Sequence, residues 1–120
     1  MKKIIIVIAF LTFGLTYAQN NRAESKIISQ FQTAFNASNY KAIYNMYSKS
    51  KQNTTTTEDI KVFFERVKNS KGDIVSLTFS NTDENYSIYK AVFSKTTGEV
   101  VVKLNNKGKA DILSTRSTQR

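Results

Sequence analysis

The spacing of the apolar residues changes once along this chain, at Asp73, and this change constrains the fold more than any other feature. Before Asp73 the apolar residues recur about every three to four positions, which is typical of amphipathic helices. After Asp73 they alternate with polar residues, which is typical of strands. Helices followed by strands that short Gly/Asn turns connect predict an α+β fold, with N-terminal helices packed on a curved antiparallel sheet of four strands.

Three segments with helical spacing are expected to form helices, at residues 24–35, 40–48 and 58–68. The pairing of Thr55 with Glu58 predicts a capping box at the start of the third helix. Gly72 is suited to a left-handed cap at its end. The side chains of this helix that we expect to point inward are Ile60, Phe63, Phe64 and Val67.

Four segments with alternating apolar and polar residues are expected to form strands, at residues 73–80, 86–94, 99–105 and 109–113. In the first strand Val75, Leu77 and Phe79 share one face. Residues 114–120 contain no apolar side chain and are expected to form a polar tail. Residues 19–113 are therefore expected to form a single α+β domain.

The N-terminus has the three-part pattern of a secretory signal peptide. Lys2 and Lys3 precede an apolar run, and Thr16 and Ala18 place small residues before a cleavage site at Gln19. The run is shorter than the roughly 20 residues that span a membrane, so residues 1–18 are expected to be removed and to leave no transmembrane segment. The protein is expected to be exported, periplasmic or secreted. Because the chain has no cysteine, it is not expected to be a lipoprotein.

The net charge of the chain is +9, and cleavage of the signal peptide would remove Lys2 and Lys3. An exported cation is attracted to anionic polymers and lipid head groups, so a cell-envelope polymer or protein is the expected partner. Nucleic acid is not expected as a partner, because export carries the chain away from it. The basic residues are scattered along the sequence, which is typical of a solvated surface.

The residues that could support chemistry are few. The chain contains no histidine and no cysteine, which excludes thiol chemistry and the usual zinc and iron–sulfur ligands, and we expect no metal, no cofactor and no catalytic residue. Ser48 and Lys51 have the Ser-x-x-Lys spacing of penicillin-recognising enzymes. The two further elements of that motif are missing, so we interpret the match as coincidental.

A resemblance to a known family rests on several short segments. Residues 35–48 resemble the opening helical hairpin of the nuclear-transport-factor-2-like superfamily. Phe63-Phe64 and the turns at 71–74 and 105–110 fit the same pattern. The chain is most similar to an uncharacterised exported bacterial branch, which often precedes a serine hydrolase of the penicillin-recognising type. The resemblance covers residues 24–113 and implies a cone-shaped sheet, but the chain stops where the hydrolase would begin.

Three tyrosines, Tyr40, Tyr44 and Tyr47, are spaced so that they share one face of a helix. They pack on the sheet in one interpretation. In the other they line the mouth of the cone-like cavity and stack on a sugar or another flat ligand. Tyr89 shares a strand face with Phe93, so the candidate ligand-binding residues are Tyr40, Tyr44, Tyr47 and Tyr89.

We therefore predict an exported, non-enzymatic binding or accessory domain that acts at the bacterial cell envelope, with a ligand that the sequence does not name. One alternative is a small cavity enzyme of the same superfamily, in which Asp111, Asp73 or a tyrosine performs acid–base work. The other is the remnant N-terminal domain of a serine hydrolase.

Overall fold

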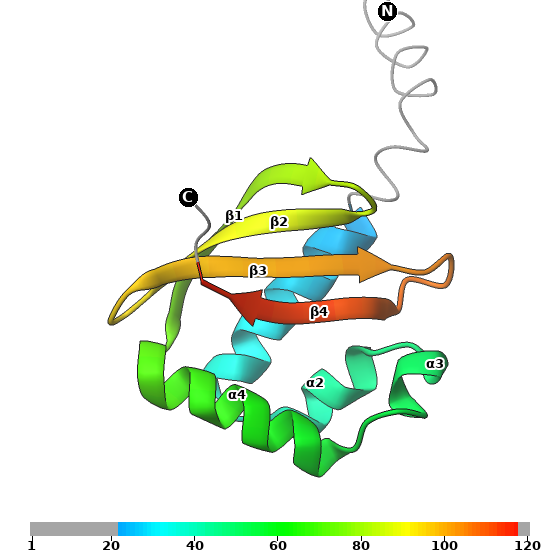
Figure 1. Cartoon of the computed structure of the whole chain (residues 1–120), viewed down its shortest axis with the longest axis horizontal. Helices are drawn as coiled ribbons and strands as arrows, with labels where there is room; N and C mark the ends of the chain where they lie inside the picture. Colours follow the sequence, from blue (N-terminus) through cyan, green and yellow to red (C-terminus); the bar gives the residue numbers. More distant parts are fainter. Residues whose placement is uncertain (1–21, 118–120) are drawn as a thin grey trace, which may run out of the picture.

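The computed structural model describes residues 22–117 (Figure 1). The predicted signal peptide at residues 1–18 and the last three residues of the predicted tail lie outside the described residues. In chain order the described elements are a first helix at residues 22–36, α2 (Tyr40–Met46), α3 (Lys49–Gln52), α4 (Thr57–Lys71), β1 (Ile74–Asp83), β2 (Tyr86–Phe93), β3 (Thr97–Leu104) and β4 (Ala110–Arg116).

The four strands form one antiparallel sheet in the order β1-β2-β3-β4. Figure 1 shows the first helix passing behind the strands and α4 running below them. The core between helices and sheet is rich in aromatic rings: the centroids of Phe31 and Phe64 are 5.4 Å apart, and those of Phe35 and Phe93 are 6.2 Å apart. The predicted α+β architecture with a four-stranded antiparallel sheet is confirmed.

The second predicted helix is shorter than expected. Asn39 caps α2, because its side chain accepts a hydrogen bond from the Ala42 amide at 3.2 Å. The helix ends at Met46, and Tyr47 adopts an extended backbone and forms a parallel bridge with Ala110, the first residue of β4. The expected range of 40–48 is therefore wrong at its end, because tertiary pairing with the sheet takes over from the helical hydrogen bonds.

The helix α4 begins at Thr57, one residue before its predicted start, and its cap lies one residue after the predicted one. The side chain of Thr56 accepts from the Asp59 amide at 3.0 Å, so the cap uses Thr56 and not the predicted Thr55. The helix continues to Lys71 and stops at Gly72, whose φ is +86°. A Cβ there would lie 1.9 Å from the Ser94 Oγ, so both the backbone and the available space require glycine.

Three apolar residues, one on α4 and two on β1, are more exposed than the apolar pattern suggested. Phe63 is 38% exposed, whereas the neighbouring Phe64 is fully buried, so the expectation that both point inward is wrong for Phe63. On β1, Val75 and Phe79 are 61% and 54% exposed. Irregular pairing between β1 and β2 follows Ile74 and Phe79, and these bulges break the simple alternation that the sequence suggested.

The last strand is longer than predicted. Ser114, Thr115 and Arg116, which the sequence analysis assigned to the polar tail, pair with β3. Arg116 closes this end of the sheet, because its Nε lies 2.8 Å from the Glu99 carboxylate. Residues 114–116 are only partly buried at the end of an edge strand, which explains why they carry no apolar signal. None of the helices within residues 22–117 is both long enough and apolar enough to span a membrane.

Candidate functional site

The predicted tyrosine site is mostly part of the core. Tyr40, Tyr47 and Tyr89 are buried, and Tyr44 is partly buried against the core. Tyr40 and Tyr47 line different surface hollows, so the structure does not bring the row together around one cavity. The placement fits the packing interpretation, and a ligand-binding role for these four residues stays a prediction.

The tyrosine hydroxyls hold elements of the fold together. Tyr47 donates to the Leu113 carbonyl of β4, and Tyr44 donates to the Gln52 carbonyl of α3 at 3.4 Å. Burial raises the pKa of Tyr47 above its usual value. Its hydroxyl therefore remains a protonated donor at neutral pH.

The sheet face that packs on the helices is filled by side chains. Val100 and Val102 in the centre of β3 have no solvent exposure and belong to the core, and the same is true of Ala91 on β2. The predicted cone-like interior is thus a packed core at these positions, and the hollows lie at the surface around the ends of the strands.

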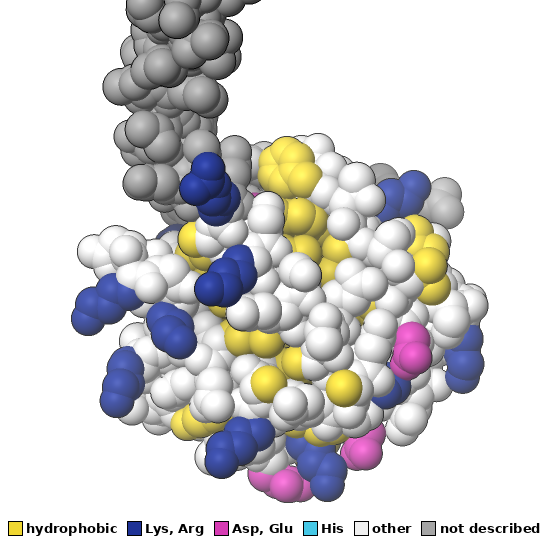
Figure 2. Space-filling view, turned by 180° about the vertical axis from the view of Figure 1, so that it is seen from behind, with side chains coloured by type: hydrophobic (Ala, Val, Ile, Leu, Met, Phe, Trp, Pro, Cys, Tyr) yellow, Lys and Arg dark blue, Asp and Glu magenta, His cyan; other side chains and the backbone are white. Residues whose placement is uncertain are grey.

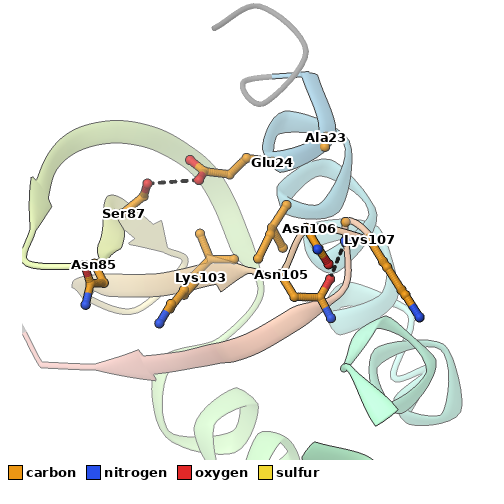
Figure 3. Close-up of a pocket in the computed structure, with 11 residues that line it drawn as sticks. Ala23, Glu24, Asn85, Ser87, Lys103, Asn105, Asn106 and Lys107 are labelled. Carbon is orange, nitrogen blue, oxygen red and sulfur yellow. Dashed lines mark hydrogen bonds between the residues drawn. The ribbon is translucent and has the colours of Figure 1, made fainter. Parts of the chain in front are cut away.

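The first hollow is a polar cleft of about 820 Å³ between the start of the first helix, the start of β2 and the turn from β3 to β4 (Figure 3). We call it the polar cleft. Its lining residues with polar side chains are Glu24, Asn85, Ser87, Lys103, Asn105, Asn106 and Lys107.

Glu24 is the most constrained group of the polar cleft. One carboxylate oxygen accepts from the Ser87 hydroxyl at 2.9 Å, and the other accepts from the Tyr89 hydroxyl at 2.6 Å. Figure 3 shows the Glu24 and Ser87 side chains pointing toward each other across the gap between helix and strand. Burial, then the hydrogen bond and negative charge of Glu24, raise the pKa of Tyr89. The carboxylate is therefore held in place by two neutral donors.

The turn from β3 to β4 forms one wall of the polar cleft. The Asn105 side chain accepts from the backbone amides of Lys107 at 2.8 Å and Lys109 at 3.0 Å. Gly108 has a φ of +79°, and its amide donates to the Asn105 carbonyl at 3.1 Å. These bonds fix the turn backbone and leave the Asn106 and Lys107 side chains exposed to solvent.

On the other side of this turn lies a second hollow of about 730 Å³, between the turn and α3. We call it the lysine groove. Four lysines line it, and Asp111 is the acid among its described lining residues. The Lys109 ammonium donates to the Asn45 carbonyl at 3.3 Å. Figure 2, seen from behind, shows several basic side chains on the side of the molecule where Figure 1 places α3 and the β3–β4 turn, and others along the bottom and the opposite edge. The lysines of the groove are Lys49, Lys51, Lys107 and Lys109.

Backbone contacts hold α3 against β4 and so fix the spacing of the lysine groove. The Ser48 amide donates to the Ala110 carbonyl at 2.8 Å. The Ser48 hydroxyl accepts from the Lys51 amide at 3.2 Å, as an N-cap. Ser48 is only 2% exposed. The Ser-x-x-Lys spacing thus has a structural explanation, since Ser48 caps the short helix that carries Lys51.

The carboxylates named as alternative acid–base groups are open to solvent. The Asp73 side chain is 57% exposed, and it lies 3.6 Å from the Lys68 ammonium. Asp111 is partly exposed in the lysine groove. Within the part of the chain that the structure describes, no three acidic residues lie close enough together to hold a metal ion.

Sequence reasoning missed both hollows. It treated the lysines as scattered, because 49 and 51 are more than fifty residues from 107 and 109. Lys49 and Lys51 follow the end of a predicted helix, and Lys107 and Lys109 lie at a predicted turn. These positions at breaks between elements were the signal in the sequence for a shared surface. The bridge between Tyr47 and Ala110 brings the two breaks together, and that contact is not visible in the sequence. Glu24 was likewise read only as the start of a helix.

Comparison of the chain with protein-family models, with curated proteins and with solved structures finds no significant match. The resemblance to the nuclear-transport-factor-2-like superfamily therefore stays a prediction.

Proposed function

We propose that this protein is an exported, non-enzymatic binding or accessory domain that acts at the bacterial cell envelope, where its lysine groove binds the acidic groups of an envelope polymer. The observation that supports this proposal is the convergence of four lysines around one groove that contains a single described carboxylate. A hollow lined by one sign of charge concentrates the field and attracts ligands of the opposite sign.

The chemistry of the groove suits repeated anionic groups. Lysine ammonium groups are compact point charges on flexible stems, so they tolerate the varied positions of acidic groups along a polymer. Ser50 and Thr54 add hydroxyls, and Asn106 adds an amide, for hydrogen bonds beside those charges. Because the lysines are exposed, screening acts over roughly 8 Å at physiological ionic strength, and binding should weaken as salt rises.

Catalysis has less support from the geometry. A carboxylate that performs acid–base work near neutral pH needs its pKa raised by burial or by a like charge. Asp73 is exposed and lies 3.6 Å from the Lys68 ammonium, so it is not a buried carboxylate. Asp111 is partly exposed in the lysine groove.

The test is a titration of the purified protein with oligogalacturonate and, separately, with poly-L-glutamate at low and physiological salt. The groove variant, K49Q/K51Q/K107Q/K109Q, removes the four charges and keeps side chains of similar polarity. An exposed ion pair contributes about 0.2–1 kcal/mol, so the loss of four charges should weaken binding by at least about fourfold at low salt.

A matched control variant, K26Q/K41Q/K61Q/K90Q, removes the same charge from exposed lysines that do not line either hollow. It should keep most of the wild-type affinity, and thermal unfolding should show that both variants are folded. Equal losses in the two variants would mean that total charge and not the groove determines binding, which contradicts the proposal.

A further inference from the structure

The polar cleft and the lysine groove share one wall. Asn105, Asn106 and Lys107, in the turn from β3 to β4, line both hollows. The turn backbone is fixed by the hydrogen bonds that the Asn105 side chain accepts. The backbone amide of Asn105 also donates to the Lys109 carbonyl at 2.7 Å. A ligand that crosses this turn would therefore contact two chemically different surfaces on a rigid support.

The polar cleft differs from the groove in its hydrogen-bonding groups. Asn85 and Asn106 provide amides that both donate and accept, and both side chains are exposed. Glu24 provides two carboxylate oxygens, each of which has one hydrogen bond from a hydroxyl of the sheet. A carboxylate oxygen has more than one acceptor site, so Glu24 can accept further bonds. The cleft thus offers a ligand both acceptors and donors.

We propose that the polar cleft is a saccharide subsite, and that the two hollows together bind an acidic polysaccharide, with sugar hydroxyls in the polar cleft and acidic groups over the lysine groove. This inference rests on the proposed function, because it assigns the chemical class of the polymer that the lysine groove binds.

Glu24 favours ligands that carry hydrogen-bond donors. A phosphate chain carries only acceptors, so it can bind Lys103 and Lys107 of the polar cleft but has no hydrogen to offer the Glu24 carboxylate, whose charge has the same sign. A sugar hydroxyl both donates to a carboxylate and accepts from an amide. The polar cleft contains both kinds of group, in Glu24 and in Asn85 and Asn106, and each hollow has a volume in the range of about 300–1,000 Å³ that is typical of ligand sites.

The experiment compares two probes of matched charge, oligogalacturonate, which carries sugar hydroxyls, and poly-L-glutamate, which does not. The cleft variant, N85A, removes an exposed amide that lines the polar cleft and not the groove, and leaves Glu24, Asn106 and the lysines in place. Losing one hydrogen bond should weaken oligogalacturonate binding by about twofold or more and leave poly-L-glutamate binding unchanged. A control with two exposed asparagines outside both hollows, N69A/N81A, should bind both probes like the wild type.

The outcomes separate this inference from the proposed function. If the cleft variant binds both probes like the wild type, or if poly-L-glutamate binds as tightly as oligogalacturonate, the saccharide subsite is wrong and the lysine groove remains as a general anion site. The second of these results would favour an acidic peptide. If the groove variant binds both probes like the wild type, or if neither probe binds the wild type, the proposed function fails as well.

Discussion

Truncation of Phe64 to alanine is expected to remove a large part of the stability of this protein, whereas the same change at Phe63 is not. Phe64 has no solvent exposure, and its ring centroid lies 5.4 Å from that of Phe31 and 6.2 Å from that of Phe35. Replacing a buried phenylalanine with alanine costs about 3–5 kcal/mol, because apolar contacts are lost and a cavity remains. Domains of this size unfold with a free energy of about 5–15 kcal/mol, so the loss is a substantial fraction of the total.

Phe63 is the matched comparison, since it precedes Phe64 in the same helix and is 38% exposed. Its ring centroid lies 4.8 Å from that of Phe64, so its truncation should cost only about 1 kcal/mol through the loss of this edge contact. Urea unfolding followed by circular dichroism measures both variants, and the midpoint for Phe64→Ala should fall by on the order of 2 M. Equal losses in the two variants would refute the assignment of Phe64 to the core and Phe63 to the surface.

Folding raises the pKa of Tyr47 and Tyr89, so their contribution to the free energy of unfolding is fully present below the unfolded pKa of about 10 and should decline at higher pH. Urea unfolding at pH 7 to 11 should show this decline, and a flat profile would contradict it. Thr56→Ala should cost about 1 kcal/mol of unfolding free energy and Thr55→Ala much less, and the reverse order would restore the cap predicted from the sequence. Gly72→Ala should lower the melting temperature, because its φ is +86° and its Cβ would collide with a side chain, and an unchanged melt would refute that strain.

The order of elements could be predicted from the sequence because it depends on local periodicity. The stripe of the first helix, Ile27, Ile28, Phe31, Ala34 and Phe35, is buried as the spacing indicates. Val100 and Val102 on β3 are likewise buried on one face. Such patterns identify an element and its inward face without knowledge of its partner.

The errors in the predicted fold arise where tertiary contacts decide the local structure. Tyr47 leaves its helix to pair with Ala110, and Ser114 to Arg116 continue β4 because β3 provides a partner for them. Phe63 continues the apolar run of α4 but lies at the edge of the helix face that the sheet covers. None of these outcomes follows from the residues of the segment itself.

The candidate site was less predictable than the fold because its groups come from distant parts of the chain. The tyrosine row had a strong local pattern, and the structure uses most of it for packing. Glu24 meets Ser87 and Tyr89 only after the first helix has packed on β2. The lysines of α3 meet those of the β3–β4 turn only through the contact between Ser48 and Ala110. Surface charge that converges in this way leaves no periodic signal.

The central claim is that the lysine groove is the binding surface, and its most direct test is a map of backbone amide chemical shifts during titration with oligogalacturonate. The account predicts that the amides of residues 48–54 and 105–111 shift most, that Asn85 and Ser87 shift with them, and that the groove variant loses these changes. Shifts that are spread evenly over the exposed lysines, or that gather on α4 and β1 away from both hollows, would contradict it.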